Sequence, residues 1–231
     1  MNNHNKQIAS QYNIISKVFD NSRVRIWNNV KHFLLDNEIY HNTNNTLLDC
    51  GCGNGKNMIY AQSLGYHSEG FDISKNLLDI CKNKGLNVYY QDVLNMNVNK
   101  KYNKIISIAV LHHLQTFDEQ IVAINNLYNC LDSRGKLLIS FWSKEKSIQD
   151  IEDTNYKDGI AKSSIFKNTK SDSRDFVVGA NYVDWKLDKE NIIKRYYYIH
   201  DYNSIRKLAE NITVNHTITW EQQNWFILFT R

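Results

Sequence analysis

The chain has 231 residues, of which 42% are hydrophobic and 23% are charged, a composition typical of a globular domain. Its net charge of +4 is too small for binding nucleic acid by charge alone, although it suits an anionic partner. No apolar run approaches the roughly 20 residues needed to span a bilayer, and the polar start MNNHNKQIAS is not a secretory signal.

These bounds predict one domain over residues 1–231, without a membrane segment, in the cytoplasm or also in the nucleus. The spacing of the four cysteines does not predict a metal site. Cys50 and Cys52 are close together, but Cys81 and Cys130 stand alone, so no four-ligand zinc site is spelled out. We therefore expect reduced cysteines and no metal.

The first predicted elements are two helices, over residues 7–20 and 24–36, after a polar start that we expect to be frayed. We expect residues 1–40 to form a helical lid. Alternating strands and helices follow. Strands are predicted over residues 46–50, 67–71, 87–92, 104–110 and 136–142, and helices over 56–64, 75–84 and 118–131. This alternation indicates a mostly parallel sheet with helices on both faces.

The last third of the chain is less regular. Residues 143–190 are predicted to be a polar insertion. A strand is then expected over 194–199, a helix over 203–210, and strands over 213–220 and 224–230. The short polar turn between the last two strands predicts an antiparallel hairpin.

The most informative motif is residues 47–56, with the sequence LLDCGCGNGK. A strand runs into a turn with three alternate glycines, and a helix follows. Glycine lets a ligand approach the backbone closely, and the helix beyond offers free N–H groups. The spacing G-x-G-x-G differs from that of dinucleotide-binding proteins and of the P-loop.

Acidic residues end the next two predicted strands. Asp72 follows the glycine turn by about twenty residues, where a carboxylate can accept hydrogen bonds from both hydroxyls of a ribose. Asp92 ends the third strand, where an adenine amino group would lie. The alternative is that both acids only cap helices and form turns. Three strand ends in a row with ligand-type residues favour a nucleoside site at one edge of the sheet.

With these residues the sequence resembles the class I S-adenosylmethionine-dependent methyltransferases. The resemblance implies a Rossmann-like seven-stranded sheet, mostly parallel with an antiparallel last strand, and S-adenosylmethionine as the cofactor. On this basis the cofactor-binding residues are expected to be Asp49, Gly51, Gly53, Asn54, Asp72, Ser74, Asp92, Val93, Ala109 and His112.

Four further segments are similar to the eukaryotic tRNA (carboxymethyluridine) methyltransferases. They are Tyr12, Phe19, Ser22-Arg23 and Trp27; the turn GCGNGK; residues 108–114 (IAVLHHL) with Thr116; and residues 195–198 (RYYY) with Asn224-Trp225. The sequence departs from that family at Gln115, at Tyr198 and at residues 183–185 (VDW). The resemblance implies a tRNA substrate, with methyl esterification of 5-carboxymethyluridine at the wobble position.

An ionised carboxylate acceptor needs positioning rather than a strong base. The expected residues of this acceptor site are Arg23, His113, Trp142, Arg195 and Tyr196. Either arginine can clamp the carboxylate, and the tryptophan can stack on a uracil. Each residue also has a structural interpretation: helix cap, loop histidine, core aromatic, surface charge or strand packing.

The resemblance also implies a small zinc-binding activator subunit that adds a strand at the sheet edge near Leu86–Tyr90. Candidate tRNA contacts are Lys157, Lys162, Lys167 and Lys170, although a solvated loop explains them slightly better. Two alternative functions stay open: a class I methyltransferase for a small molecule, another RNA or a protein, and a catalytically silent scaffold subunit.

Overall fold

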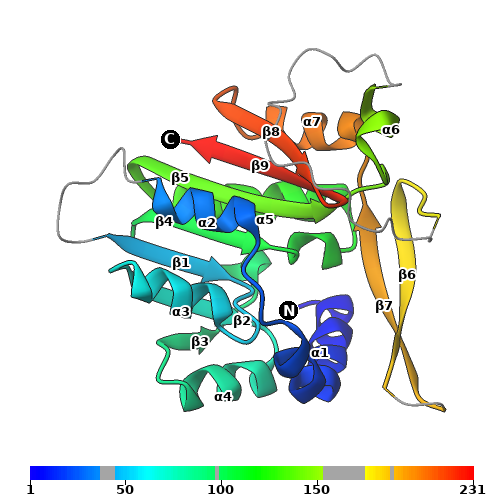
Figure 1. Ribbon diagram of the computed structural model, residues 1–231, viewed down its shortest axis with the longest axis horizontal. Coiled ribbons are helices and arrows are strands. Elements are labelled where there is room, and N and C mark those ends of the chain that lie inside the picture. The colour runs from blue at the N-terminus through cyan, green and yellow to red at the C-terminus, as the bar shows by residue number, and fades with distance from the viewer. Residues whose placement is uncertain (37–44, 97–98, 153–174, 188–189) are drawn as a thin grey trace.

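The computed structural model describes residues 1–36, 45–96, 99–152, 175–187 and 190–231. At its centre is a seven-stranded sheet in the order β3-β2-β1-β4-β5-β9-β8 (Figure 1). The strands of this sheet are β1 (Thr46–Cys50), β2 (His67–Asp72), β3 (Val88–Tyr90), β4 (Tyr102–Ile108), β5 (Leu131–Trp142), β8 (His216–Glu221) and β9 (Asn224–Thr230).

Strands β3, β2, β1, β4 and β5 pair in parallel, whereas β9 is antiparallel to both of its neighbours, β5 and β8. The predicted fold class is therefore confirmed, including the antiparallel last strand and the terminal hairpin. Strand β4 is buried along almost its whole length, because helices cover both faces of a parallel sheet.

The helices form a layer on each face of the sheet. They are α1 (Asn3–Ser22), α2 (Asn28–Leu35), α3 (Lys56–Ser63), α4 (Lys75–Asn83), α5 (Phe117–Asn129), α6 (Ile148–Glu152) and α7 (Tyr202–Glu210), with short 3-10 turns at Val93–Asn95 and Leu111–His113. Helices α5 and α7 pack on one face, around Leu127 and Leu208. Helices α2 and α3 pack on the other, around Leu34, Ala61 and Ile106.

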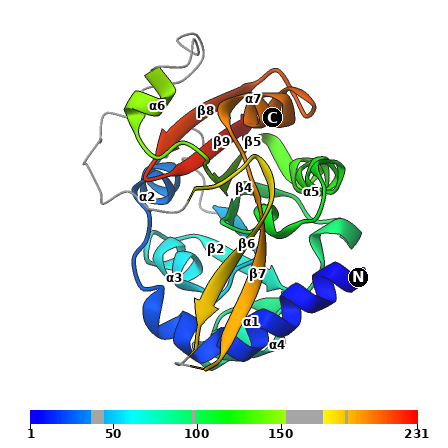
Figure 2. The ribbon, with the colours of Figure 1, turned by 90° about the vertical axis from the view of Figure 1, so that its right-hand side faces the viewer.

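The N-terminus differs from the prediction. Helix α1 begins at Asn3 instead of residue 7, and the stretch expected to be frayed is helical. The side chain of Asn2 caps the helix by accepting a hydrogen bond from the Asn5 N–H at 2.8 Å. Asn5 is buried, and its side-chain amide donates to both carboxylate oxygens of Asp92, which offsets the cost of burying it. Helix α1 packs beside α4 and β7 (Figure 2).

The predicted polar insertion, residues 143–190, contains ordered elements that the sequence did not indicate. Strand β6 (Gly179–Lys186) pairs antiparallel with β7 (Ile192–Ile199) in a separate two-stranded ribbon. Strand β6 was missed because its outward positions are exposed and only Val183 is buried. Residues 153–174, which include Lys157, Lys162, Lys167 and Lys170, lie outside the described residues.

Strand β3 is an edge of the sheet, as expected, and Tyr90 on it is 46% exposed. The other predicted strands agree with the structure within a few residues, except that β5 starts at Leu131 instead of residue 136. In the part of the chain that the structure describes, no helix is both long and apolar enough to cross a membrane.

Candidate functional site

A cavity of about 440 Å³ lies at the carboxyl ends of the parallel strands. The residues after β1, β2, β3, β4 and β5 all reach it, because parallel strands end at the same edge of a sheet. Its lining includes the predicted residues Arg23, Gly51, Gly53, Asn54, Asp72, Asp92, Val93, Ala109, His112, His113, Trp142 and Arg195. The structure thus brings most of the predicted site together.

The glycine loop after β1 requires its glycines. Gly51 and Gly53 have φ values of +69° and +55°, in the left-handed region that side chains disfavour. A Cβ on Gly51 would lie 2.5 Å from Cγ2 of Val110, and one on Gly53 would lie 3.2 Å from the ring of Phe19. A side chain at Gly51 would therefore collide with the segment after β4, and one at Gly53 would crowd α1.

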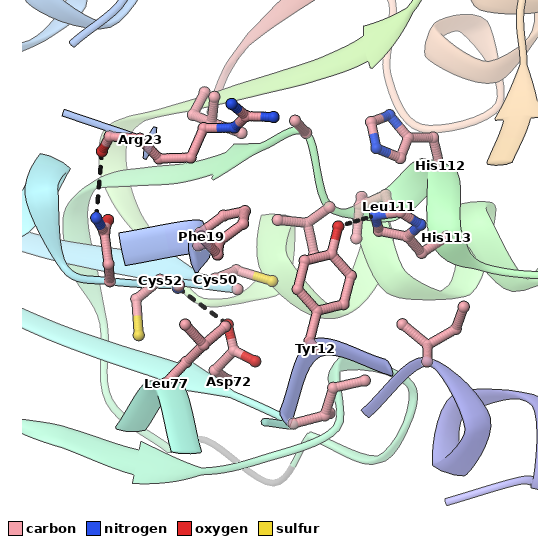
Figure 3. Close-up of a pocket in the computed structure, with 18 of the residues that line it drawn as sticks. Tyr12, Phe19, Arg23, Cys50, Cys52, Asp72, Leu77, Leu111, His112 and His113 are labelled. Atoms are coloured by element: carbon pink, nitrogen blue, oxygen red, sulfur yellow. Dashed lines mark hydrogen bonds between the residues drawn. The ribbon is translucent and has the colours of Figure 1, made fainter. Parts of the chain in front are cut away.

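Asp72, at the end of β2, is held in one orientation by the backbone. Its Oδ2 accepts a hydrogen bond from the Gly53 N–H at 2.9 Å (Figure 3). Its Oδ1 accepts one from the Ser74 N–H at 2.8 Å. Burial raises the pKa of this carboxyl, while the two backbone donors oppose the shift. The result is a preorganised carboxylate on the cavity wall.

Two predicted cofactor residues, Asp49 and Ser74, do not line the cavity. Asp49 is buried behind the glycine loop, where desolvation raises its pKa to about 8. Its Oδ2 has no hydrogen-bond partner among the described residues. Ser74 caps α4, since its Oγ accepts from the Leu77 N–H and donates to Asn13. Both residues shape the site from behind.

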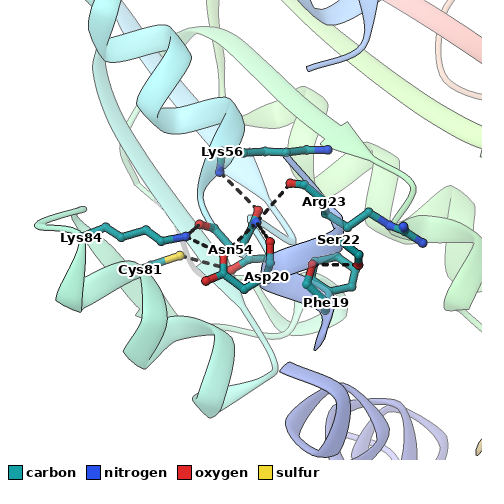
Figure 4. Close-up of polar contacts among 9 residues, drawn as sticks. Phe19, Asp20, Ser22, Arg23, Asn54, Lys56, Cys81 and Lys84 are labelled. Atoms are coloured by element: carbon teal, nitrogen blue, oxygen red, sulfur yellow. Dashed lines mark hydrogen bonds and ion pairs between the residues drawn. The ribbon is translucent and has the colours of Figure 1, made fainter. Parts of the chain in front are cut away.

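Asn54 ties the glycine loop to the end of α1 (Figure 4). Its amide donates to Oδ1 of Asp20 at 3.0 Å and to the carbonyl of Arg23 at 3.2 Å. Lys84 joins the cluster by donating to Asp20 and to the carbonyl of Asn54. The side chain of Asn54 is therefore used in holding α1, although the residue also borders the cavity.

Asp92 and Val93, after β3, and Ala109, after β4, also line the cavity. Besides its bonds from Asn5, Asp92 accepts from the Leu94 N–H at 3.1 Å and starts the 3-10 turn there. Ala109, after β4, has a φ of +59°, a strained conformation for a residue with a Cβ. Its N–H is held by the Ser140 hydroxyl at 2.9 Å.

The two histidines after β4 are neutral. Burial lowers the pKa of His113 to about 3 and that of His112 well below its ordinary value. Nδ1 of His113 lies 2.7 Å from the carbonyl oxygen of Tyr196, and its Nε2 lies 2.8 Å from the hydroxyl of Tyr12. Nδ1 of His112 accepts from the Trp142 N–H at 3.3 Å. Neither ring supplies a positive charge to the cavity.

Arg195, on β7, does supply a positive charge. It is only 4% exposed, so the interpretation as a surface charge is wrong. Its guanidinium carbon lies 4.4 Å from the ring centre of Trp185 and 5.2 Å from that of Tyr197. Among the described residues no carboxylate pairs with it, and its Nε has no hydrogen-bond partner. A buried, unpaired cation is costly unless an anion joins it.

The remaining predicted residues occupy different places. Arg23 is exposed at the cavity mouth, with its guanidinium 5.4 Å from the ring centre of Trp185. Trp142 is half-buried and stacks on Tyr197, with ring centres 4.2 Å apart and planes at 12°. Tyr196 does not line the cavity; its hydroxyl donates to the Gln115 carbonyl at 2.8 Å.

The lining residues that were not among the predicted site residues include Asn5, Tyr12 and Tyr197. Tyr197 could have been found from strand alternation, because it shares a face of β7 with Arg195. Asn5 and Tyr12 are seven residues apart and so lie on one face of α1. No sequence signal indicates which face of that helix turns toward the sheet.

The match to known families follows this geometry. Residues 21–172 match the methyltransferase domain family, which is about two thirds of the chain. The chain belongs to the methyltransferase domain family. Its methyl donor is S-adenosylmethionine. Within the described ranges, no group of three or more His, Cys, Asp or Glu side chains is placed to hold a metal ion.

Solved methyltransferases share the fold at low sequence identity. The DhpI-SAM-HEP complex matches 98% of this chain and 96% of that one, with a TM-score of 0.67 and 12% identity. Magnesium protoporphyrin IX methyltransferase from Synechocystis, with bound SAM, matches 100% and 98%, with a TM-score of 0.61 and 15% identity. These likenesses establish the architecture of the methyltransferase.

Curated relatives are more similar in sequence but longer. A tRNA (carboxymethyluridine(34)-5-O)-methyltransferase of Arabidopsis thaliana is 34% identical over 142 residues, covering 61% of this chain and 34% of that protein. A probable tRNA methyltransferase 9B of Mus musculus is 29% identical over 148 residues, covering 64% and 32%. The alignments with this methyltransferase thus span about a third of the length of these two relatives.

Proposed function

We propose that this methyltransferase acts on tRNA and forms the methyl ester of 5-carboxymethyluridine at the wobble position. The observation that carries the proposal is Arg195, a buried guanidinium without an acidic partner among the described residues, in the wall of a methyltransferase cavity. Such a group fits an anionic acceptor. The names of the curated relatives supply the particular carboxylate.

At the cofactor end, the residues present fit S-adenosylmethionine. The carboxylate of Asp72 would accept the ribose hydroxyls, and Asp92 with Val93 would meet the adenine. Gly51 and Gly53 line the cavity, and their lack of a Cβ lets Val110 and Phe19 pack against the loop. Ala109 and His112 would complete the wall, while Asp49, Asn54 and Ser74 would support it from behind. When bound, the cofactor supplies a methyl group activated by a sulfonium.

Gly51→Ala should weaken cofactor binding about tenfold, which corresponds to roughly 1.4 kcal/mol, because the new Cβ would lie 2.5 Å from Cγ2 of Val110 and would shift the cavity wall. Calorimetry with S-adenosylhomocysteine measures the effect. Gly65→Ala is the matched control: its φ is +88°, but nothing lies within 4 Å of the added Cβ. Equal affinity in the two variants would contradict the role of the loop.

At the acceptor end, positioning explains the residues present. A carboxylate is ionised at neutral pH, so no general base is needed, in accord with the neutral, fully hydrogen-bonded His113. Arg195 would hold the acceptor carboxylate, and Arg23 would guide it at the mouth. Trp142 would offer an aromatic face to the uracil. Tyr196 would act indirectly, through its carbonyl bond to His113.

The organisation of the chain fits the same proposal. Residues 1–231 would form one methyltransferase domain in which α1, within the predicted lid of residues 1–40, covers the cavity. Residues 143–190 would contribute β6, which pairs with β7, the strand that carries Arg195. The exposed edge strand β3 would receive a strand from a small zinc-binding activator. A location in the cytoplasm, extending to the nucleus, stays a prediction.

Mass spectrometry of nucleosides tests the proposal. tRNA that carries 5-carboxymethyluridine is incubated with S-adenosylmethionine and the chain, with and without a candidate activator. We expect the nucleoside mass to rise by one methyl group, and mild alkali to reverse the change because it hydrolyses esters. Methyl transfer only to another RNA, a protein or a small molecule would favour the first alternative. Cofactor binding without transfer to any acceptor would favour the scaffold.

A further inference from the structure

The helix α1 contacts both halves of the cavity through one face. Near its start, Asn5 donates to Asp92 at the cofactor end. Near its end, the ring of Phe19 closes over Gly53 of the glycine loop. Between them Tyr12 points toward the acceptor end, where it meets His113 (Figure 3). One rigid element therefore carries contacts to groups that the two ligands would use.

The hydrogen-bond chain through Tyr12 has only one direction. The carbonyl oxygen of Tyr196 can only accept, so the nearby Nδ1 of His113 carries the proton. Because this imidazole is neutral, its Nε2 has a lone pair and must accept. The hydroxyl of Tyr12 therefore donates to Nε2, across 2.8 Å. Its own oxygen is left to accept, and it faces Nη1 of Arg195 at 3.3 Å.

This contact matters because Arg195 has little else to orient it. Aromatic rings surround the guanidinium, and they favour a cation over their faces without fixing its rotation. Within the described residues, the hydroxyl of Tyr12 is its one hydrogen-bond acceptor. The other N–H groups of the fork stay available for a carboxylate.

Tyr12 is itself fixed by its neighbours in the helix. The amide of Gln11 donates to the carbonyl of Lys194 on β7 at 2.8 Å. Oδ1 of Asn13 accepts from the hydroxyl of Ser74 at 2.8 Å and from the Asn76 N–H at 3.1 Å. Three consecutive residues thus attach α1 to β7, to the acceptor site and to α4.

We propose that Tyr12 is a positioning residue that sets the orientation of Arg195 and so makes the acceptor site depend on the docking of α1. The role as an acceptor clamp rests on the proposed function, whereas the contact between Tyr12 and Arg195 does not. Because α1 also covers the cofactor end, binding of S-adenosylmethionine would favour the docked helix and so prepare Arg195 for the acceptor.

The test uses the full chain with S-adenosylhomocysteine bound and the variant Tyr12→Phe. The first readout is the NMR signal of the Arg195 guanidinium in arginine-labelled protein, assigned by its loss in Arg195→Lys. We expect restrained, separate N–H signals that broaden or average in Tyr12→Phe. Tyr66→Phe is the control, since it removes a buried hydroxyl that donates to the Leu34 carbonyl, away from the cavity. Unchanged signals in Tyr12→Phe would overturn the positioning role.

The second readout is binding of acetate, the smallest carboxylate probe, followed by tryptophan fluorescence. Loss of one hydrogen bond to a charged group is worth roughly 1.5 kcal/mol, which predicts about tenfold weaker acetate binding and a similar rise in KM for tRNA, with little change in kcat. Cofactor affinity should stay within about twofold of wild type. In the Arg195→Lys background, Tyr12→Phe should have no further effect, because it acts through Arg195.

The outcomes separate the two ideas. If the wild-type protein does not bind acetate while Tyr12→Phe still broadens or averages the NMR signals of Arg195, the proposed carboxylate acceptor is wrong and the positioning contact stands. If Tyr12→Phe weakens acetate binding equally with and without Arg195, Tyr12 touches the acceptor itself and the positioning role is wrong. An equal fall in cofactor and acetate affinity would reduce Tyr12 to a packing residue and would also overturn it.

Discussion

Arg195→Ala is expected to lower kcat/KM for the tRNA acceptor by roughly 100- to 1,000-fold, because truncating one partner of a buried, hydrogen-bonded charge pair costs about 3–4 kcal/mol. The affinity for S-adenosylhomocysteine should stay close to wild type. Arg195 is 4% exposed and lies among aromatic rings, so water cannot replace its charge easily. Single-turnover transfer of labelled methyl measures the first quantity, and calorimetry measures the second.

Two further variants sharpen this result. Arg195→Lys keeps the charge but loses the planar fork, so it should recover only part of the activity. Arg25→Ala removes an exposed arginine that also borders the cavity, and its effect should be small and abolished by salt. Wild-type turnover in Arg195→Ala would exclude the residue from the acceptor site. A matching loss of cofactor binding would instead assign it to the structure of the cavity.

Asp72→Ala is expected to raise the Kd for S-adenosylmethionine by about 100-fold. Two hydrogen bonds from ribose hydroxyls to a carboxylate are worth roughly 1.5 kcal/mol each, and 1.4 kcal/mol is a factor of ten. The variant also leaves the N–H groups of Gly53 and Ser74 without their acceptor, which loosens the glycine loop. Unchanged affinity by calorimetry would refute the ribose assignment.

Acid should reproduce part of this effect in the wild-type chain. Burial raises the pKa of Asp72, so its carboxylate protonates at a higher pH than an ordinary aspartate would. The neutral acid accepts hydrogen bonds less well, so cofactor affinity should fall as the pH falls through that raised pKa. Asp72→Asn has no such proton to gain, and its weaker affinity should stay level over the same range. A parallel fall in both proteins would assign the pH dependence to another group.

Most of the residues predicted for the cofactor line one cavity, because their positions follow from the order of the strands. A glycine turn after a strand and an acid at the next strand end define positions in a parallel sheet before any side chain is packed. Asp49 and Ser74 show where that reasoning weakens. Motif position predicted both for the cofactor site, but neither lines the cavity: Asp49 is buried, and the hydroxyl of Ser74 is bonded to Asn13 of α1.

The acceptor end was less predictable because it is assembled from distant segments. Tyr12, His113 and Arg195 meet only because α1 and β7 pack over the 3-10 turn after β4. Strand β6, which brings Trp185 onto Arg195, alternates exposed and half-buried residues that resemble a polar loop in sequence. This segment becomes a strand by pairing with β7, and the local sequence of a segment does not reveal which strand it pairs with.

The antiparallel strand β9 also governs when the sheet can close during synthesis. Lys136 on β5 pairs with Thr230 on β9, while β8 reaches the sheet only through β9. Bringing such distant segments together carries a loop-closure entropy that local hairpins avoid. Until residues 224–230 have been synthesised, β5 lacks its β9 partner, and its unpaired backbone groups would be open to pairing with another strand.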